Sequence, residues 1–205
     1  MDTKAVQDSI GTLNAALIAN PNNACNYLDR AIMNSAIKKY NESFADYSKS
    51  LYHDSTNVMA WFSRANTRFK LIELIHSFDD NQPKENTKIN NRTNKTQPKK
   101  NIELTDNTYQ MVINDYSKAL QLDPNFTFAW YNRADTKVLT GDYKGAVSDY
   151  NKTIELNPNL EEAYFNRGLV LLFLKDNANA CKDISKAGEL GITESYNIIK
   201  RYCYK

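Results

Sequence analysis

The fold is decided by the stretch AWYNRADTKVLTGDYKGAVSDYNKTIELNPNL, residues 129–160, which recurs as AYFNRGLVLLFLKDNANACKDISKAGEL, residues 163–190. A single fixed offset superposes Trp130 on Tyr164, Arg133 on Arg167 and Asp149 on Asp183. This offset is about 34 residues, and a fixed period between 20 and 50 residues is typical of a solenoid built from stacked copies of one structural unit. The repeat therefore predicts an elongated array rather than one central core.

The same register divides most of the chain into units of this kind. Residues 1–23 have the pattern of the second helix of a repeat, so we expect a partial repeat or an N-terminal cap there. The expected units are 24–57, 58–126, 127–160 and 161–192, followed by a capping helix over 193–205. The second unit is about twice as long as the others, so it contains an insertion about as long as one repeat. A half repeat at one end predicts that the chain is a piece of a longer array.

These units resemble the tetratricopeptide repeat, in arrays of the bacterial type. The resemblance rests on an aromatic side chain followed four positions later by a small one, and on a closing proline. The matching residues are Tyr27 with Ala31, Trp61 with Ala65, Trp130 with Ala134, Tyr164 with Gly168, and the prolines Pro124 and Pro158. The chain departs from the family where the usual leucine of the first helix is arginine in all four units. The resemblance implies an all-α fold, a right-handed superhelical α-solenoid of antiparallel helix pairs, and a non-enzymatic protein–protein interaction scaffold.

Every unit carries an arginine near the middle of its first helix and an aspartate at the matching level of its second. The pairs are Arg30 with Asp46, Arg64 with Asp115, Arg133 with Asp149, and Arg167 with Asp183. In a hairpin that turns midway between them, the two residues meet at one level of the helix pair, so we expect a bidentate ion pair. Two alternatives compete with it. A lysine three residues after each aspartate takes the carboxylate, or the arginines form a ladder for anionic ligands.

By the same resemblance, the first helix of each unit lines a concave groove. The side chains expected there are Leu28, Ile32, Phe62, Asn66, Phe69, Tyr131, Asp135, Val138, Phe165, Leu169 and Leu172. This aromatic and aliphatic lining suits a peptide or protein segment held by apolar anchors. Family members that bind the carboxylate tails of chaperones use Lys and Asn at two of these positions, and this chain has no such pair, so we expect a different partner. The alternative is that many of these side chains belong to the core.

The additional residues of the second unit fall mainly in an insert at about 79–104. Over residues 81–100 the insert has six basic side chains, one acidic side chain and no aromatic one, a composition that does not form a packed core. The helical apolar pattern continues from Phe69 to Phe78, so we expect the preceding helix to extend beyond its usual end. The insert is then a passive loop, a basic arm that recruits an anionic partner, or a segment that covers the groove. Without aromatic side chains for stacking, nucleic acid is not an expected partner.

Composition argues against several other classes of protein. Lys and Arg number 26 against 24 Asp and Glu, and no apolar run reaches the roughly 18 residues needed to span a bilayer. The two histidines, His53 and His76, lack a second ligand at metal spacing. Gly141 and Gly145 fit a turn between helices rather than a phosphate-binding loop. We therefore expect no enzymatic activity, no catalytic residue, no cofactor, no metal and no membrane span.

The three cysteines, Cys25, Cys181 and Cys203, are an odd number without CxxC spacing. This pattern argues against a disulfide framework and a zinc site, and it predicts thiols that are packed or idle. Free thiols favour a cytoplasmic protein, whereas an export signal removed from the N-terminus would make it an exported or periplasmic one. The scaffold function has one further alternative, self-association as an assembly segment of a larger array.

Overall fold

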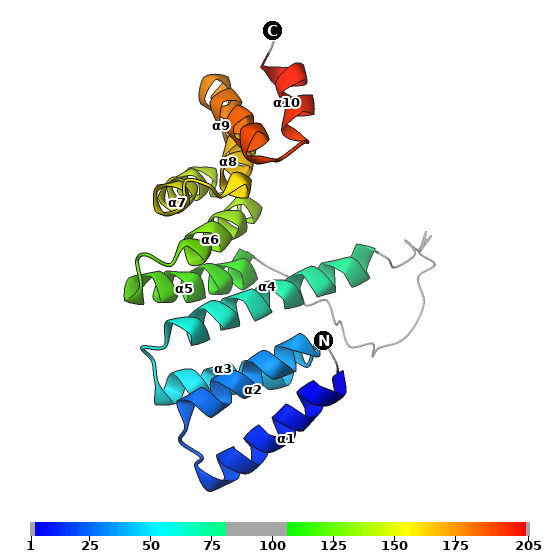
Figure 1. The fold of residues 1–205 in the computed structure, drawn as a ribbon, viewed down its shortest axis with the longest axis vertical. Helices are drawn as coiled ribbons and strands as arrows, with labels where there is room; N and C mark the ends of the chain where they lie inside the picture. The colour runs from blue at the N-terminus through cyan, green and yellow to red at the C-terminus, as the bar shows by residue number, and fades with distance from the viewer. Residues whose placement is uncertain (1–2, 81–105, 204–205) are drawn as a thin grey trace, which may run out of the picture.

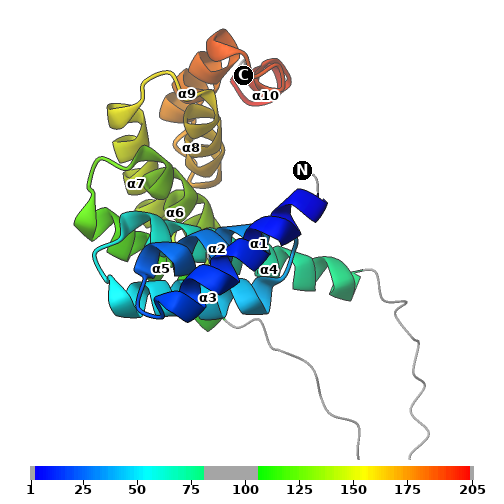
Figure 2. The same cartoon turned by 60° about the horizontal axis from the view of Figure 1, so that its bottom comes forward.

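The computed structural model describes residues 3–80 and 106–203, and all regular secondary structure in these ranges is helical. The helices are α1 (Thr3–Ala19), α2 (Ala24–Ala36), α3 (Tyr40–His53), α4 (Val58–Asp80), α5 (Asp106–Leu122), α6 (Thr127–Leu139), α7 (Tyr143–Leu156), α8 (Glu161–Phe173), α9 (Asn177–Leu190) and α10 (Ser195–Tyr202). They stack in chain order into a curved array with α1 and α10 at opposite ends (Figure 1, Figure 2). The predicted all-α solenoid of antiparallel helix pairs is confirmed.

The turns inside three of the pairs share one backbone conformation. Lys38, Gly141 and Lys175 have positive φ angles of 62°, 78° and 64°, in the left-handed region that commonly follows the end of a helix and that glycine adopts without steric cost. The helices α7 and α9 each have an aspartate as N-cap, Asp142 and Asp176. Its side chain accepts a hydrogen bond from the backbone N–H three residues further along the chain. The chain therefore reverses within a few residues, and the two helices of a pair lie antiparallel.

Small residues at equivalent positions allow the helices to approach closely. The alanines at these positions are Ala31, Ala65 and Ala134, all fully buried. In the fourth pair the equivalent residue is Gly168, where a Cβ would lie 2.7 Å from Cγ1 of Ile184. Aromatic side chains fill the space between helices, the most deeply buried being Tyr47, Tyr116 and Tyr150. The core is thus a row of small and large side chains along the array.

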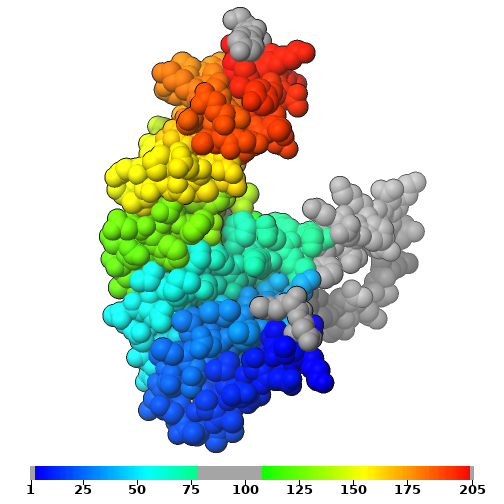
Figure 3. All heavy atoms as spheres, viewed as in Figure 1, coloured from blue at the N-terminus to red at the C-terminus, as the bar shows by residue number. Residues whose placement is uncertain are grey.

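Each described helix packs mainly against the helices that precede and follow it in the chain. The most extensive contacts join α2 to α3, α4 to α5, α6 to α7, and α8 to α9, the two helices of one repeat. Contacts between successive repeats, such as α5 with α6 or α7 with α8, are smaller. This is the quasi-one-dimensional packing of a repeat protein. One side of the array is hollowed between α4 and the C-terminal helices (Figure 3).

The helix α4 is longer than the other first helices. It has 23 residues, whereas α2, α6 and α8 have 13 each, and its C-terminal end projects from the stack (Figure 1). The predicted extension of this helix through Phe78 is confirmed. From residue 81 onward, the predicted insert at about 79–104 lies outside the described residues.

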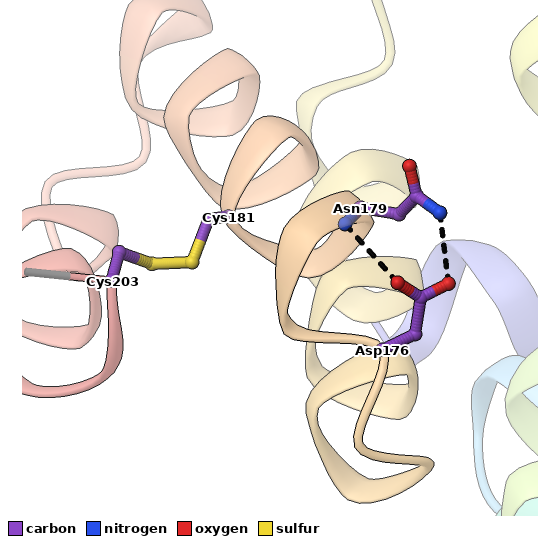
Figure 4. The surroundings of a disulfide bond; sticks show 4 residues. All are labelled: Asp176, Asn179, Cys181 and Cys203. Atoms are coloured by element: carbon purple, nitrogen blue, oxygen red, sulfur yellow. Dashed lines mark hydrogen bonds between the residues drawn. A yellow bond between two sulfur atoms is a disulfide. The ribbon is translucent and has the colours of Figure 1, made fainter. Parts of the chain in front are cut away.

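A disulfide bond joins Cys181 on α9 to Cys203 at the end of α10 (Figure 4). The prediction that these two cysteines are packed or idle thiols was wrong, because the chain turns back after Gly191 and brings the Cα atoms of the two cysteines to 5.8 Å. Cys25 is free and exposed. Only Cys25 is therefore a free thiol of the kind expected in the cytoplasm.

Candidate functional site

The arginine and aspartate of each repeat bridge its two helices. In every repeat two guanidinium nitrogens contact the two oxygens of one carboxylate, which is the bidentate arrangement. The nitrogen–oxygen distances are 2.6 and 2.7 Å for Arg30–Asp46, 2.7 and 2.9 Å for Arg64–Asp115, 2.7 and 2.8 Å for Arg133–Asp149, and 2.7 Å twice for Arg167–Asp183. All four aspartates are buried. Each pair therefore connects the two helices of its repeat at a buried level.

Further contacts engage the remaining surface of these guanidinium groups. A third nitrogen donates to the preceding repeat unit in three of them: Arg30 to Asn14, Arg133 to Ser117, and Arg167 to Asn151. The guanidinium carbons of Arg64 and Arg133 also lie 4.7 and 4.6 Å from the ring centroids of Trp61 and Trp130. The hydrogen bond to Asp46 raises the pKa of Arg30. Arginines held in this way have little capacity left for anionic ligands.

The lysines that follow the aspartates bind elsewhere in the last two repeats. Lys152 pairs with Glu155 and Lys186 with Glu189. In the second and third repeats the aspartate has a second cationic partner besides its arginine, and this partner lies on the first helix. Arg68 contacts Asp115 at 2.8 Å, and Lys137 contacts Asp149 at 2.8 Å. The second and third repeats therefore hold one buried carboxylate between two cations.

A second set of polar side chains connects neighbouring repeats beneath the hollowed side. Tyr116 and Asn132 both donate to Oδ1 of Asn66, at 2.5 and 3.0 Å. One repeat further on, the Tyr150 hydroxyl and the Asn166 amide donate in the same way to Oδ1 of Asp135. The two networks occupy equivalent positions in successive repeats and differ in their acceptor, which is Asn66 in one and Asp135 in the other. The second network also includes the hydroxyl of Tyr131, where the first has Phe62.

Three adjoining cavities, two of them over these networks, form a row that we call the groove. The first, of about 300 Å³, is lined by Asn66, Phe69, Lys70, Glu73, Tyr116, Asn132 and Asp135. The second, of about 330 Å³, is lined by Phe69, Glu73, Asp135, Val138, Leu139, Tyr150, Asn166, Leu169 and Val170. The third, of about 570 Å³, is lined by Leu169, Leu172, Phe173, Asn177, Asn197, Ile198, Arg201 and Tyr202. The first and second cavities share Phe69, Glu73 and Asp135, and the second and third share Leu169, so the three cavities adjoin one another from α4 to α10.

The structure brings six of the eleven predicted groove residues together in these cavities. The six are Asn66, Phe69, Asp135, Val138, Leu169 and Leu172. Two others pack in the core, where the ring of Phe62 lies 4.5 Å from that of Phe126 and Tyr131 packs beside Tyr150. The remaining three, Leu28, Ile32 and Phe165, are partly exposed and do not line the three cavities.

Other lining residues were not anticipated from the sequence. Lys70 is the thirteenth residue of α4, at the position that Leu139 has in α6, and Glu73 lies in the extension of α4 beyond the length of the other first helices. Ile198, Arg201 and Tyr202 belong to α10. The predicted extension of the helix through Phe78 was a usable signal for Glu73. Nothing in the sequence indicated that α10, packed against α9, lines one cavity together with α8, because that depends on the turn after Gly191 and the disulfide bond.

The electrostatics of the groove centre on Asp135. Burial raises the pKa of this carboxyl above its ordinary value, and hydrogen bonds from Tyr150, Asn166 and Tyr131 oppose the shift. Burial also raises the pKa of the Tyr150 and Tyr131 hydroxyls, and the nearby Asp135 charge adds to the effect. These hydroxyls therefore remain protonated donors at neutral pH.

Two other kinds of feature are missing from the described part of the chain. Residues 3–80 and 106–203 contain no group of three or more His, Cys, Asp or Glu side chains that could hold a metal ion. Within the same ranges no helix combines the length and apolarity needed to cross a bilayer.

Comparison with known proteins agrees with this architecture. Residues 134–173 match a family model described as TPR repeat, and residues 161–190 match one described as tetratricopeptide repeat. Residues 134–190 thus match tetratricopeptide repeats. Arrays of these repeats are protein–protein interaction scaffolds and are typically non-enzymatic. No curated protein sequence matches the chain significantly.

Solved tetratricopeptide structures share the fold over most of their length. A crystal structure of MamA is 20% identical, with 91% of this chain and 89% of that chain covered and a TM-score of 0.69. MamA from Desulfovibrio magneticus RS-1 is 12% identical, with 90% and 85% covered and a TM-score of 0.68. PilF from Pseudomonas aeruginosa is 14% identical, with 92% and 70% covered and a TM-score of 0.67. At these identities the likeness shows the fold alone.

Proposed function

We propose that this tetratricopeptide-repeat protein is a non-enzymatic scaffold that binds a segment of another protein in the groove between α4 and α10. The observation that carries the proposal is the row of three adjoining cavities, lined mainly by the first helices α4, α6 and α8 and by the capping helix α10. Apolar side chains are exposed along it, including Leu139 at 54% and Phe173 at 64% of their surface. A concave surface of this kind binds an extended or helical segment through apolar anchors.

The ion pairs favour a protein segment over a phosphate-bearing ligand. Arg30, Arg64, Arg133 and Arg167 are each bound to a buried aspartate, so none of the four offers an unpaired cation to the groove. The lining is instead apolar with amide, hydroxyl and carboxylate groups at its floor. Such groups suit the backbone and side chains of a polypeptide.

Substitution of exposed groove residues tests the proposal without disturbing the core. Leu139→Lys and Leu169→Lys place a charge in the groove, while Tyr52→Lys makes the same change on α3, where Tyr52 is 85% exposed and outside the groove. Proteins captured from the source lysate should be retained by the Tyr52→Lys variant and lost by the two groove variants. Capture that is equal for all three folded variants would contradict groove binding.

Self-association is separated from partner binding by the mass of the purified protein. If the groove binds another protein, light scattering of the purified chain should give the same molecular mass at all concentrations. A mass that rises with concentration and stays constant in the Leu169→Lys variant would instead identify a second copy of the chain as the occupant of the groove.

A further inference from the structure

Asp135 is unusual among the aspartates in the interior of the described repeats. Asp46, Asp115, Asp149 and Asp183 each receive a bidentate arginine. Among the described residues Asp135 has only neutral donors and forms no ion pair. A partly buried carboxylate without a cation is less favourable than a paired one, because burial removes part of its hydration.

The hydrogen-bond network does not require this negative charge. At the equivalent position of the preceding repeat, the neutral amide oxygen of Asn66 accepts the same two bonds, from Tyr116 and Asn132. The fold therefore forms the inter-repeat network with an amide as the acceptor. The charge of Asp135 is additional to what the packing of α6, α7 and α8 needs.

The additional charge faces the groove. Asp135 lines both the first and the second cavity, and Glu73 of α4 lines the same two cavities. Glu73 is exposed and forms no ion pair with any described residue. Lys70 is the one basic residue lining the first of these cavities, and it is exposed and makes no ion pair in the described part of the chain. The first two cavities of the groove thus contain two carboxylates that form no ion pair with a described cation.

We infer that the groove receives a partner segment with a lysine or arginine side chain at the Asp135 and Glu73 carboxylates and apolar side chains in the neighbouring cavities. This inference rests on the proposed function and specifies the chemistry of the partner. A cationic side chain complements the two carboxylates, and its aliphatic stem packs against Phe69 between them. The next apolar side chain of the segment meets Val138, Leu139 and Leu169 in the second cavity.

Synthetic peptides of matched sequence test the cation separately from the groove. The probes are short fluorescein-labelled peptides with leucine and phenylalanine at the flanking positions and lysine, norleucine or glutamate at the centre. Norleucine keeps the aliphatic stem of lysine and removes only the charge. Binding is measured by fluorescence anisotropy on the intact chain, on Asp135→Asn, and on Glu155→Gln, which removes one carboxylate from the exposed face of α7.

We expect the effect of the peptide's charge on binding affinity to depend on whether residue 135 is an aspartate. Exchanging lysine for norleucine should weaken binding about fivefold or more on the intact chain and on Glu155→Gln, but less than about twofold on Asp135→Asn. Asp135→Asn keeps an acceptor oxygen for Tyr150 and Asn166, as Asn66 provides for Tyr116 and Asn132, so the variant should keep the native fold. Equal ratios on all three proteins, or a preference for the glutamate peptide, would overturn the inference.

The groove variant Leu169→Lys distinguishes failure of this inference from failure of the proposed function. If Leu169→Lys abolishes peptide binding while the lysine-to-norleucine ratio is the same with and without Asp135, the groove binds peptides and only the cation site is wrong. If Leu169→Lys changes nothing, or if no peptide binds up to about 1 mM, the proposed function fails as well.

Discussion

Two successive repeats, α4–α5 and α6–α7, differ in the length of the segment that connects their two helices. Arg64 and Asp115 are 51 residues apart in sequence, and Arg133 and Asp149 are 16 apart, yet both pairs are bidentate at 2.7–2.9 Å. Each aspartate also contacts a second cation, Arg68 or Lys137 respectively. The geometry of a repeat is therefore set by the facing side chains of its helices rather than by the length of the connection.

The same two repeats differ in the groove. Their equivalent acceptors are Asn66 and Asp135, which hold the same type of hydrogen-bond network without and with a formal charge. The comparison separates what the fold needs, an acceptor at this position, from what the fold does not need, a carboxylate. The charge of the Asp135 carboxylate is therefore the feature to test for a function.

The largest expected effect comes from removing the buried aspartates. Asp115→Ala and Asp149→Ala each leave two largely buried cations without their carboxylate, and breaking such a pair costs about 3–5 kcal/mol. Urea unfolding followed by the fluorescence of Trp61 in one repeat and Trp130 in the other measures both losses. Similar losses are expected. A clearly smaller loss for Asp115→Ala would show that the connection does influence the energetics of the ion pair.

The next effect concerns the C-terminal helix and leaves both of these repeats as they are. Cys203→Ser opens a covalent loop with a sequence separation of 22 residues, which in the chain-entropy account contributes about 3 kcal/mol. Hydrogen exchange over residues 195–202 should become faster, while exchange in α4–α7 stays unchanged. Faster exchange throughout α4–α7 would contradict the nearest-neighbour packing of the array.

A smaller effect separates the neutral and the charged network. Tyr116→Phe removes a hydrogen bond to the amide oxygen of Asn66, at a cost of about 0.5–1.5 kcal/mol. Tyr150→Phe removes a bond to a carboxylate, at about 1.5–3 kcal/mol. Chemical denaturation of the two variants side by side gives the difference. Equal costs would indicate that Asp135 is uncharged under the conditions used.

The smallest expected effect is a pH-dependent stabilisation by Asp135→Asn. Because burial raises the folded-state pKa of Asp135, ionisation costs stability as the pH rises from the unfolded-state value, about 3.9, through the folded-state pKa. The variant should therefore gain less than about 1 kcal/mol at pH 7, and the gain should vanish at about pH 3. Thermal unfolding at the two pH values measures it.

The groups around Asp135 support this assignment. Tyr131 lies on its own helix, Tyr150 on α7 and Asn166 on α8, and Lys70 and Glu73 of α4 face it across the first cavity. The two tyrosine pKa values are raised by burial, so these hydroxyls do not titrate in the acidic range. The reverse exchange, Asn66→Asp, is the matched control and should destabilise the protein at pH 7. A gain with Asn66→Asp would contradict the account.

The sequence predicted the helix pairs well because their signals are local and repeated. The aromatic residues, the small residues and the Arg and Asp positions recur in every repeat, so errors at one position are corrected at another. It did not predict the disulfide, because the approach of Cys181 and Cys203 depends on a single turn after the last repeat. The groove was predicted in part. Phe62 and Phe69 both pack against the same core cluster, and helical spacing does not show that only Phe69 also lines the groove.

The neighbour-to-neighbour packing of the helices also has a mechanical consequence. Because no central core holds the described repeats together, the curvature of the array is the sum of small rotations at successive interfaces. A groove built in this way deforms elastically, because a small rotation at each interface between helices adds up to a wider or narrower opening. Partner segments of different thickness are then accommodated by strain that is shared among the interfaces.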